Sequence, residues 1–124
     1  MGTIIYKFSF PIHAITKDNF KGVTRYGRPY LSKEFKDFEH TLQCMFQSQK
    51  PKDFKRIETE DVFVGLSYFF KNRRHSDLFN LPKSTLDAFN GIIWKDDRQI
   101  KAGILRCEEY APDDKIELEF WIKE

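Results

Sequence analysis

The sequence is poor in cysteine and contains no long hydrophobic run. Its two cysteines, Cys44 and Cys107, lack the spacing of metal ligands and are too few for a disulfide framework, which indicates a reducing compartment. No apolar stretch approaches the roughly 20 residues of a membrane span, and the N-terminal residues lack the pattern of a secretory signal. These features predict a cytoplasmic protein without a membrane partner.

A strong excess of charge of either sign is also missing. The chain has 21 Lys and Arg against 19 Asp and Glu, for a formal net charge of +2. A charge this small selects no class of partner, so partners must be inferred from where charges cluster. The chain is instead rich in aromatic residues, with 13 Phe, 5 Tyr and 2 Trp among 124 residues, which can supply one apolar core. Length and composition therefore predict one folded domain over residues 1–124.

Residue periodicity predicts two helices and four strands. Ser32 is a good N-cap, and apolar residues follow it at three- and four-residue spacings. Asn80 can cap a second helix, which Gly91 would end in a left-handed conformation. A turn at Pro112–Asp114 predicts that the last two strands pair with each other in antiparallel fashion. The expected elements are strand 3–10, helix 32–49, strand 60–70, helix 80–90, strand 98–107 and strand 115–122.

This element order, β-α-β-α-β-β, predicts an α/β fold in which a small mixed sheet carries packed helices. Residues 60–70 have apolar side chains on both faces of the expected strand. They are therefore expected to form a central strand that is covered by helix on at least one side. Residues 12–31 are expected to form a long surface loop, and loops of this length in compact domains are often functional.

Charged residues concentrate in the segment 71–100. A basic cluster precedes Asp77, Asp77 precedes the second helix, and the pair Asp96 and Asp97 follows it. Cations can hold phosphates, and a hard cation such as Mg²⁺ takes one or two carboxylates together with waters and substrate oxygens. Because neighbouring side chains of an extended segment point to opposite faces, only one residue of the aspartate pair is expected at such a site. The layout predicts a metal-dependent enzyme that acts on a polyanion.

The same segment carries a series of short motifs. Residues 77–80 read DLFN, Lys83 follows, residues 86–91 read LDAFNG and residues 94–100 read WKDDRQI. This series resembles that of the RusA-type Holliday-junction resolvases, in which the first motif is Asp-Leu-Asp-Asn. Phe79 therefore stands where the family has its second aspartate.

The resemblance implies a Mg²⁺-dependent endonuclease, with Mn²⁺ as a substitute metal, that cuts four-way junctions or other branched DNA. Its expected setting is recombination, repair or phage replication. The resemblance selects Asp77 and Asp97 as catalytic metal ligands and Lys83 as the catalytic lysine that offsets charge at the scissile phosphate. Asp87 would complete the metal shell or orient Lys83. A homodimer is implied as well, because a junction needs paired cuts on two strands.

The basic cluster has two interpretations. A charge run alone is usually a solvated face, but beside candidate metal ligands it predicts a phosphate clamp formed by Lys71, Arg73 and Arg74 together with Lys83. Further basic residues that would extend a DNA-binding surface are Lys17, Lys21, Arg25, Arg28, Lys50, Lys52, Lys55 and Arg56.

Alternative interpretations remain open at this point. The Asp96 and Asp97 pair alone would be a solvated turn, and Lys83 with Asp87 would be a surface ion pair four residues apart on a helix. Phe79 supplies no ligand, so the chain is either a nuclease in which Asp87 or substrate oxygens compensate, or a junction-binding protein of the same fold without effective cleavage. The third alternative is a small interaction protein whose acidic turns keep it soluble.

Overall fold

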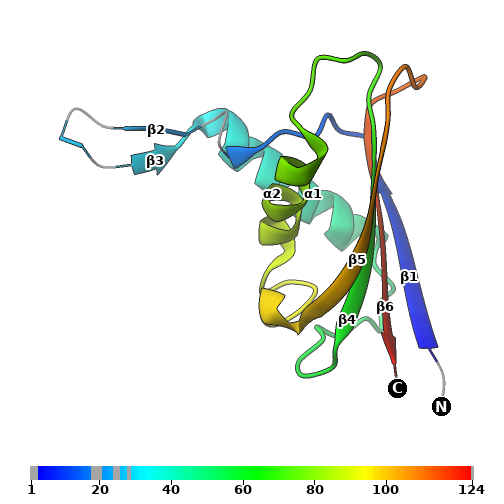
Figure 1. The fold of residues 1–124 in the computed structure, drawn as a ribbon. Coiled ribbons are helices and arrows are strands. Elements are labelled where there is room, and N and C mark those ends of the chain that lie inside the picture. The colour runs from blue at the N-terminus through cyan, green and yellow to red at the C-terminus, as the bar shows by residue number, and fades with distance from the viewer. Residues whose placement is uncertain (1–2, 18–20, 24–25, 28, 124) are drawn as a thin grey trace.

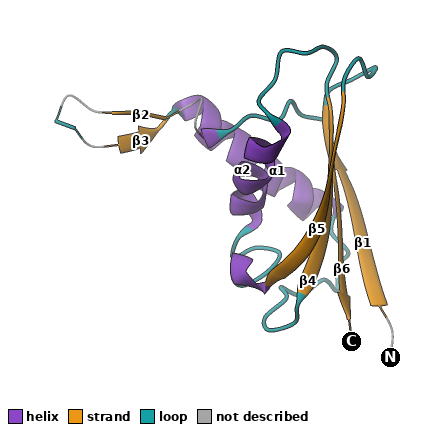
Figure 2. Ribbon diagram, in the orientation of Figure 1, coloured by secondary structure: helices purple, strands orange, loops and turns teal. Residues whose placement is uncertain are grey.

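A four-stranded mixed sheet forms the frame of the protein, and two helices pack on one of its faces (Figure 1). The computed structural model describes residues 3–17, 21–23, 26–27 and 29–123. Figure 2 shows the helices as one layer beside the sheet. The elements are β1 (Thr3–Phe10), β2 (Lys21–Val23), β3 (Pro29–Leu31), α1 (Lys33–Gln49), β4 (Val62–Phe69), α2 (Leu81–Phe89), β5 (Ile100–Glu108) and β6 (Lys115–Lys123), with short 3₁₀ turns η2 (Leu78–Asn80) and η3 (Asp97–Gln99).

The strand order in the sheet is β1-β6-β4-β5. β6 runs antiparallel to both β1 and β4, whereas β5 runs parallel to β4. The mixed α/β sheet is therefore confirmed, but the prediction that the last two strands pair with each other is wrong. β6 buries one whole face through Ile116, Leu118 and Phe120 and takes an inner position, whereas most of β5 is exposed at the sheet edge. The chain reaches β5 from β4 through α2, which is the usual connection between parallel strands.

Local sequence signals account for the two helices. The Ser32 hydroxyl accepts a hydrogen bond from the Phe35 backbone N–H at 3.3 Å, as expected of an N-cap, and α1 then continues to Gln49. α2 begins beside Pro82 and stops before Gly91, whose φ of 81° is the left-handed conformation that glycine adopts freely. Both predicted helices are confirmed, although Asn80, at the N-cap position of α2, makes no side-chain capping hydrogen bond.

The core lies between the sheet and the helices. Alternate residues of β4 from Val62 to Tyr68 are buried, as the sequence predicts. Aromatic rings fill much of the space. The ring centroid of Phe46 in α1 lies 5.0 Å from that of Phe8 in β1 and 5.9 Å from that of Phe89 in α2. The fully buried residues of greatest volume are Trp94, Tyr68, Phe10, Phe35, Phe46, Phe70, Phe89 and Phe120.

The segment expected as a loop over 12–31 contains a short hairpin. β2 and β3 pair in antiparallel fashion, and the hairpin extends away from the sheet (Figure 1). Arg25 and Arg28, proposed as DNA contacts, lie outside the described residues. No helix in the described part of the chain has the length and apolarity needed to cross a lipid bilayer.

Candidate functional site

Helix α2 carries two of the predicted site residues, the exposed Lys83 and the partly buried Asp87. The buried Tyr68 and Thr85 hydroxyls share a hydrogen bond of 2.9 Å, which fixes the opposite face of α2 to β4. Burial raises the pKa of Tyr68, so this hydroxyl stays neutral and available for the bond. Lys83 and Asp87 are thereby directed away from the sheet, and their ammonium and carboxylate groups lie 3.6 Å apart.

Asp87 has a closer partner than Lys83. The Lys17 Nζ donates to Asp87 Oδ2 at 2.8 Å, and Lys83 approaches the same oxygen. The Lys83 side chain is 83% exposed, whereas those of Lys17 and Asp87 are 31% and 18% exposed. Lys17 was expected only as part of an extended DNA-binding surface, so its place at Asp87 is a finding of the structure.

The segment before Lys17 is held against α2. The Lys17 backbone N–H donates to the Ser84 hydroxyl at 3.0 Å, and Ser84 is almost fully buried. The neighbouring Thr16 is also buried, and its hydroxyl lies 3.4 Å from that of Ser76 in the loop that follows β4. Lys17 therefore reaches Asp87 from a fixed backbone position.

Asp97 lies in the 3₁₀ turn η3 that precedes β5. The indole Nε1 of the fully buried Trp94 donates to Asp97 Oδ1 at 2.7 Å. Asp96 instead caps this turn, because its carboxylate accepts from the Arg98 backbone N–H at 2.9 Å and the Gln99 side chain accepts from the Asp96 backbone in return. The two aspartate side chains therefore have different partners because Asp96 takes part in a capping box, and not because they alternate along a strand.

Asp87 and Asp97 lie near enough for each carboxyl group to shift the pKa of the other. Burial raises the pKa of Asp97, and the negative charge of Asp87 raises it further, against the lowering effect of the Trp94 hydrogen bond. Burial also acts to raise the pKa of Asp87, but the hydrogen bond and charge of Lys17, together with the charge of Lys83 and the influence of Asp97, outweigh it and leave this pKa below its ordinary value. The pKa values of the two carboxyl groups are therefore shifted in opposite directions.

Glu39 of α1 belongs to the same surroundings. The pKa of Glu39 is raised, chiefly by burial. The positive charge of Lys17 acts to lower this pKa, and the negative charge of Asp87 acts to raise it. Glu39 could not be recognised from the sequence, because nothing in the residue spacing of α1 connects it to Asp87, almost fifty positions later.

Asp77 and Phe79 lie at the other end of α2. Asp77 is exposed, stands at the N-cap position of η2 without a side-chain capping bond, and is not among the charges that shift the pKa of Asp87 or Asp97 in the described structure. Phe79 is 85% exposed. Among the described residues, no group of three or more His, Cys, Asp or Glu is placed to hold a metal ion. The assignment of Asp77, Asp87 and Asp97 as metal ligands stays a prediction.

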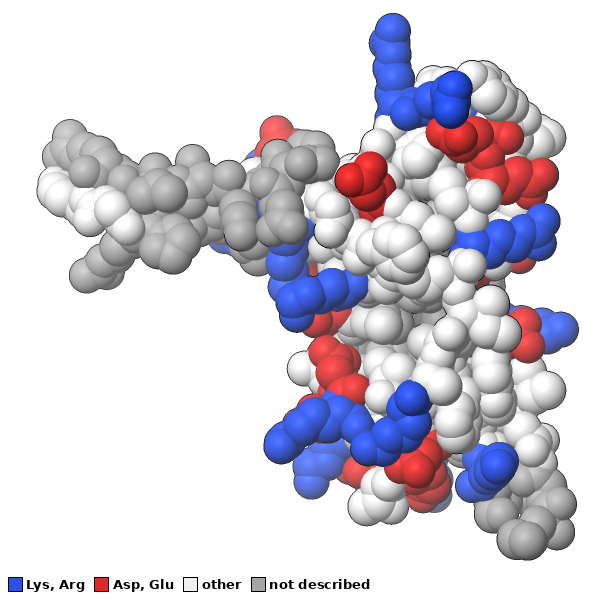
Figure 3. Space-filling model, in the orientation of Figure 1, with Lys and Arg blue, Asp and Glu red and all other residues white. Residues whose placement is uncertain are grey.

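The predicted phosphate clamp lies in the loop after β4. Lys71, Arg73 and Arg74 are all exposed. The loop itself is anchored, because the Lys71 backbone donates to Asp114 at 2.8 Å, and His75 stacks on Phe70 with ring centroids 4.0 Å apart. Lys and Arg side chains project at this end of the molecule, although cations and anions are mixed over the face as a whole (Figure 3).

A comparison with models of known protein families gives a match. The family model described as endodeoxyribonuclease RusA matches residues 11–120. The chain belongs to the RusA family. The match takes in Lys17, Glu39 and the whole segment 71–100, so the family resemblance of the sequence is confirmed, and membership supports endodeoxyribonuclease activity on DNA junctions. No curated protein matches the chain.

The raised pKa of Asp97 leads to a prediction about stability. Because the native state binds this proton more tightly than the unfolded chain does, ionisation of Asp97 costs stability as pH rises past the ordinary aspartate range. Asp97→Asn keeps an acceptor for Trp94 and removes the charge beside Asp87. Urea unfolding should show this variant to be more stable than the wild type at about pH 7, with the gain vanishing at about pH 3.

The neighbouring residue supplies the control for this experiment. The hydrogen bond from Arg98 lowers the pKa of Asp96, so ionisation of Asp96 favours the folded state and Asp96→Asn should gain no stability at neutral pH. Equal stabilisation by both substitutions would show that burial beside Asp87 is not the cause.

Proposed function

We propose that this RusA-family protein is a divalent-metal-dependent endonuclease that cuts four-way junctions or other branched DNA in recombination, repair or phage replication. The family match supports endonuclease activity. The observation that carries the proposal is the proximity of Asp87 and Asp97, which come from two separate elements, with the exposed ammonium of Lys83 3.6 Å from Asp87.

The donor set fits a hard cation. Asp87 and Asp97 provide carboxylate oxygens, which Mg²⁺ prefers, and Mg²⁺ commonly needs only one or two carboxylates because waters and substrate phosphate oxygens fill the remaining positions. Asp77, exposed at the start of η2, is the further catalytic ligand that the family pattern suggests. When bound, Mg²⁺ or its substitute Mn²⁺ would polarise the phosphate and lower the pKa of the attacking water.

Lys83 suits the role of a phosphate contact. Its side chain is 83% exposed, and at 3.6 Å its contact with Asp87 is loose enough to exchange for a phosphate oxygen. Asp87 would orient Lys83 toward the scissile group, where a positive charge stabilises the charge that develops. The exposed Lys71, Arg73 and Arg74 would hold the flanking phosphates.

A second candidate function rests on Phe79. This side chain occupies the position of a family aspartate and points into solvent, so it adds no oxygen ligand at the end of α2 where Asp77 lies. A protein with this substitution can bind a junction through its basic loop while cutting it slowly or not at all. Junction binding without nicking would identify this second function.

The first prediction of the proposal separates binding from cleavage. Replacing Arg73 and Arg74 with alanine should weaken binding to a synthetic four-way junction and reduce the slope of log affinity against log salt by about 1 for each phosphate that is no longer neutralised. Asp77→Asn and Asp97→Asn should instead leave binding intact or tighter and remove nicking, because they delete ligand charges that also repel phosphate. Loss of binding in the aspartate variants, with normal binding in the arginine variants, would refute these roles.

The second prediction concerns the missing carboxylate. Phe79→Asp should raise metal affinity and increase nicking at limiting Mg²⁺, because an added carboxylate raises the ligand charge on which metal affinity depends. Wild-type cleavage should be weak in Mg²⁺ and partly rescued by Mn²⁺. The measurement is a metal titration of nicking by both proteins on the same junction. Equal and robust cleavage would show that another group replaces the aspartate, and Asp87 would be the first to test.

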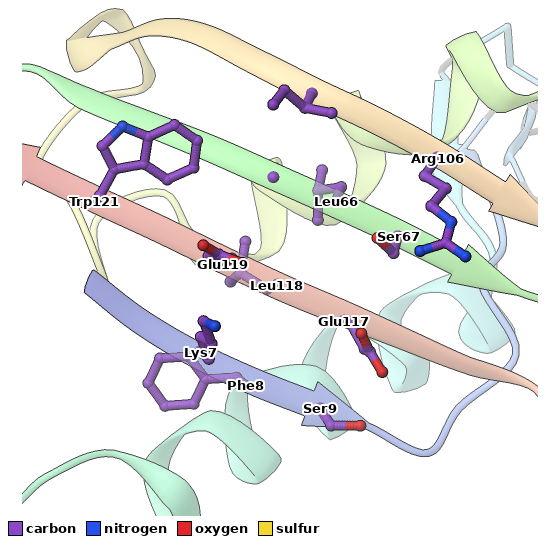
Figure 4. A pocket seen from close by; sticks show the side chains of 12 residues that line it. Lys7, Phe8, Ser9, Leu66, Ser67, Arg106, Glu117, Leu118, Glu119 and Trp121 are labelled. Atoms are coloured by element: carbon purple, nitrogen blue, oxygen red, sulfur yellow. The ribbon is translucent and has the colours of Figure 1, made fainter.

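We further propose that the exposed face of the sheet joins two copies of the chain. Neither α1 nor α2 covers this face (Figure 4). It holds a hollow of about 390 Å³, and Gly65, which has no side chain, is one of the lining residues. Ile104, 68% exposed, and Trp121 supply apolar surface. A two-fold interface must be self-complementary, and a lining that holds both signs of charge meets that condition. The polar lining residues are Lys7, Ser9, Ser67, Arg106, Glu117 and Glu119.

The third prediction tests this dimer. Sedimentation at micromolar concentration should show a dimer for the wild type and a monomer for Ile104→Glu, since the substitution buries an unpaired charge in the interface. Gln47→Glu, on the exposed side of α1, is the matched control and should remain dimeric. A wild-type monomer, with and without junction DNA, would count against the dimer altogether.

A further inference from the structure

The Lys17 ammonium stands where a cation would bind Asp87. It lies 2.8 Å from Asp87 Oδ2, the most direct contact that this carboxylate makes with a positive charge in the described structure. We propose that Lys17 is an internal cation that competes with the divalent metal for Asp87 and thereby sets the metal affinity of the site. This inference rests on the proposed metal-dependent function and assigns a regulating residue to it.

The position of Lys17 is built into the fold. Its backbone N–H is bonded to the buried Ser84 hydroxyl, and its ammonium lies 5.9 Å from the centroid of the Phe35 ring, within the range of a cation–π contact. The preceding residue, Thr16, is 2% exposed and lies within hydrogen-bond distance of Ser76. Lys17 is therefore held by its own backbone hydrogen bond, by its contact with the Phe35 ring and by the buried residue before it, unlike a surface lysine that reaches Asp87 by chance.

Lys17 and Lys83 differ in how readily they can leave. Both approach Asp87 Oδ2, but Lys83 does so at 3.6 Å from a side chain that is 83% exposed, so it can move into solvent or toward a phosphate at little cost. Lys17 approaches at 2.8 Å and is 31% exposed, so its charge stays near the carboxylate. A divalent ion at Asp87 meets the repulsion of Lys17 even when Lys83 has moved away.

The competition has a direct chemical basis. The ammonium donates to a lone pair of Asp87 Oδ2, and a metal ion that uses the same oxygen must displace that hydrogen bond. A metal ion that uses the other oxygen still lies within a few ångströms of a like charge in a partly buried site, where screening by water is reduced. In both cases, Lys17 weakens metal binding, and while no metal is bound it offsets the charge of Asp87.

The test compares metal binding by three proteins. Lys17→Met removes the charge and keeps a long apolar stem, and the bond from its backbone to Ser84 does not depend on the side chain. Titration with Mn²⁺, followed by the electron paramagnetic resonance of the free ion, should show binding at least about tenfold tighter than in the wild type, given the strength of charge interactions in such sites. Lys36→Met, which removes an exposed lysine of α1, should leave the affinity unchanged. Unchanged or weaker Mn²⁺ binding in Lys17→Met would overturn the proposal.

A second measurement uses the wild type and so does not depend on the folding of a variant. Amine-reactive labelling followed by mass spectrometry should show that Mn²⁺ increases the modification of Lys17, because the displaced ammonium becomes accessible, while that of Lys36 stays constant. Labelling of Lys17 that is unchanged or reduced by Mn²⁺ would overturn the competition.

Parallel nicking assays distinguish the two levels of failure. If the wild type nicks a junction in a metal-dependent manner but Lys17→Met binds Mn²⁺ no more tightly, the role of Lys17 is wrong and the proposed function stands. If neither protein binds Mn²⁺ or nicks a junction, the metal-dependent function fails, and the role of Lys17 fails with it.

Discussion

Partial burial of the Asp87 carboxylate is the constraint on which the rest of the site depends. A charge removed from water needs a counter-charge, and Lys17 provides it at 2.8 Å from a segment seventy residues earlier in the chain. The same burial places Asp87 against Asp97, so that one carboxyl is stabilised in its charged form while the pKa of the other is raised. The anchoring of residues 14–17, the orientation of α2 and the turn before β5 can thus be understood as three parts of one electrostatic arrangement.

Patterns in the sequence predict the single helices and strands of this fold better than they predict how the strands pair. Alternation and helical spacing report which side of an element is buried, and β1, α1, β4 and α2 were predicted closely for that reason. Alternation does not report which strand lies next to which, and the antiparallel pairing expected between the last two strands was wrong because β6 takes the inner position beside β4. The short hairpin within residues 12–31 was missed as well, because its strands have three residues each.

The residues of the candidate site were likewise predicted where they lie in one local segment, and missed where only the packing of the chain brings them together. The motifs of the segment 71–100 identified Lys83, Asp87 and Asp97 as candidate site residues, because their spacing is local and resembles a family pattern. Lys17 and Glu39 could not be found in this way, since only the packing of the N-terminal segment and α1 against α2 brings them to Asp87. Tertiary contacts between residues distant in sequence leave no periodic trace in a single chain.

The balance of charge around α2 bears on how DNA binding and cutting relate. Lys17 and Lys83 both approach Asp87, and the charge of Lys83 also acts on Asp97, so without a metal the two lysines offset part of the negative charge of Asp87, Asp97 and Glu39. Under the proposed function, a phosphodiester would approach through the exposed cations of the loop after β4, with the repulsion from the aspartates reduced by the lysines. A bound divalent ion would then add the positive charge that phosphate cleavage requires, and Lys17 would oppose that ion at Asp87. Holding a junction would therefore demand less of this site than cutting it, and this asymmetry is why the two functions must be measured separately.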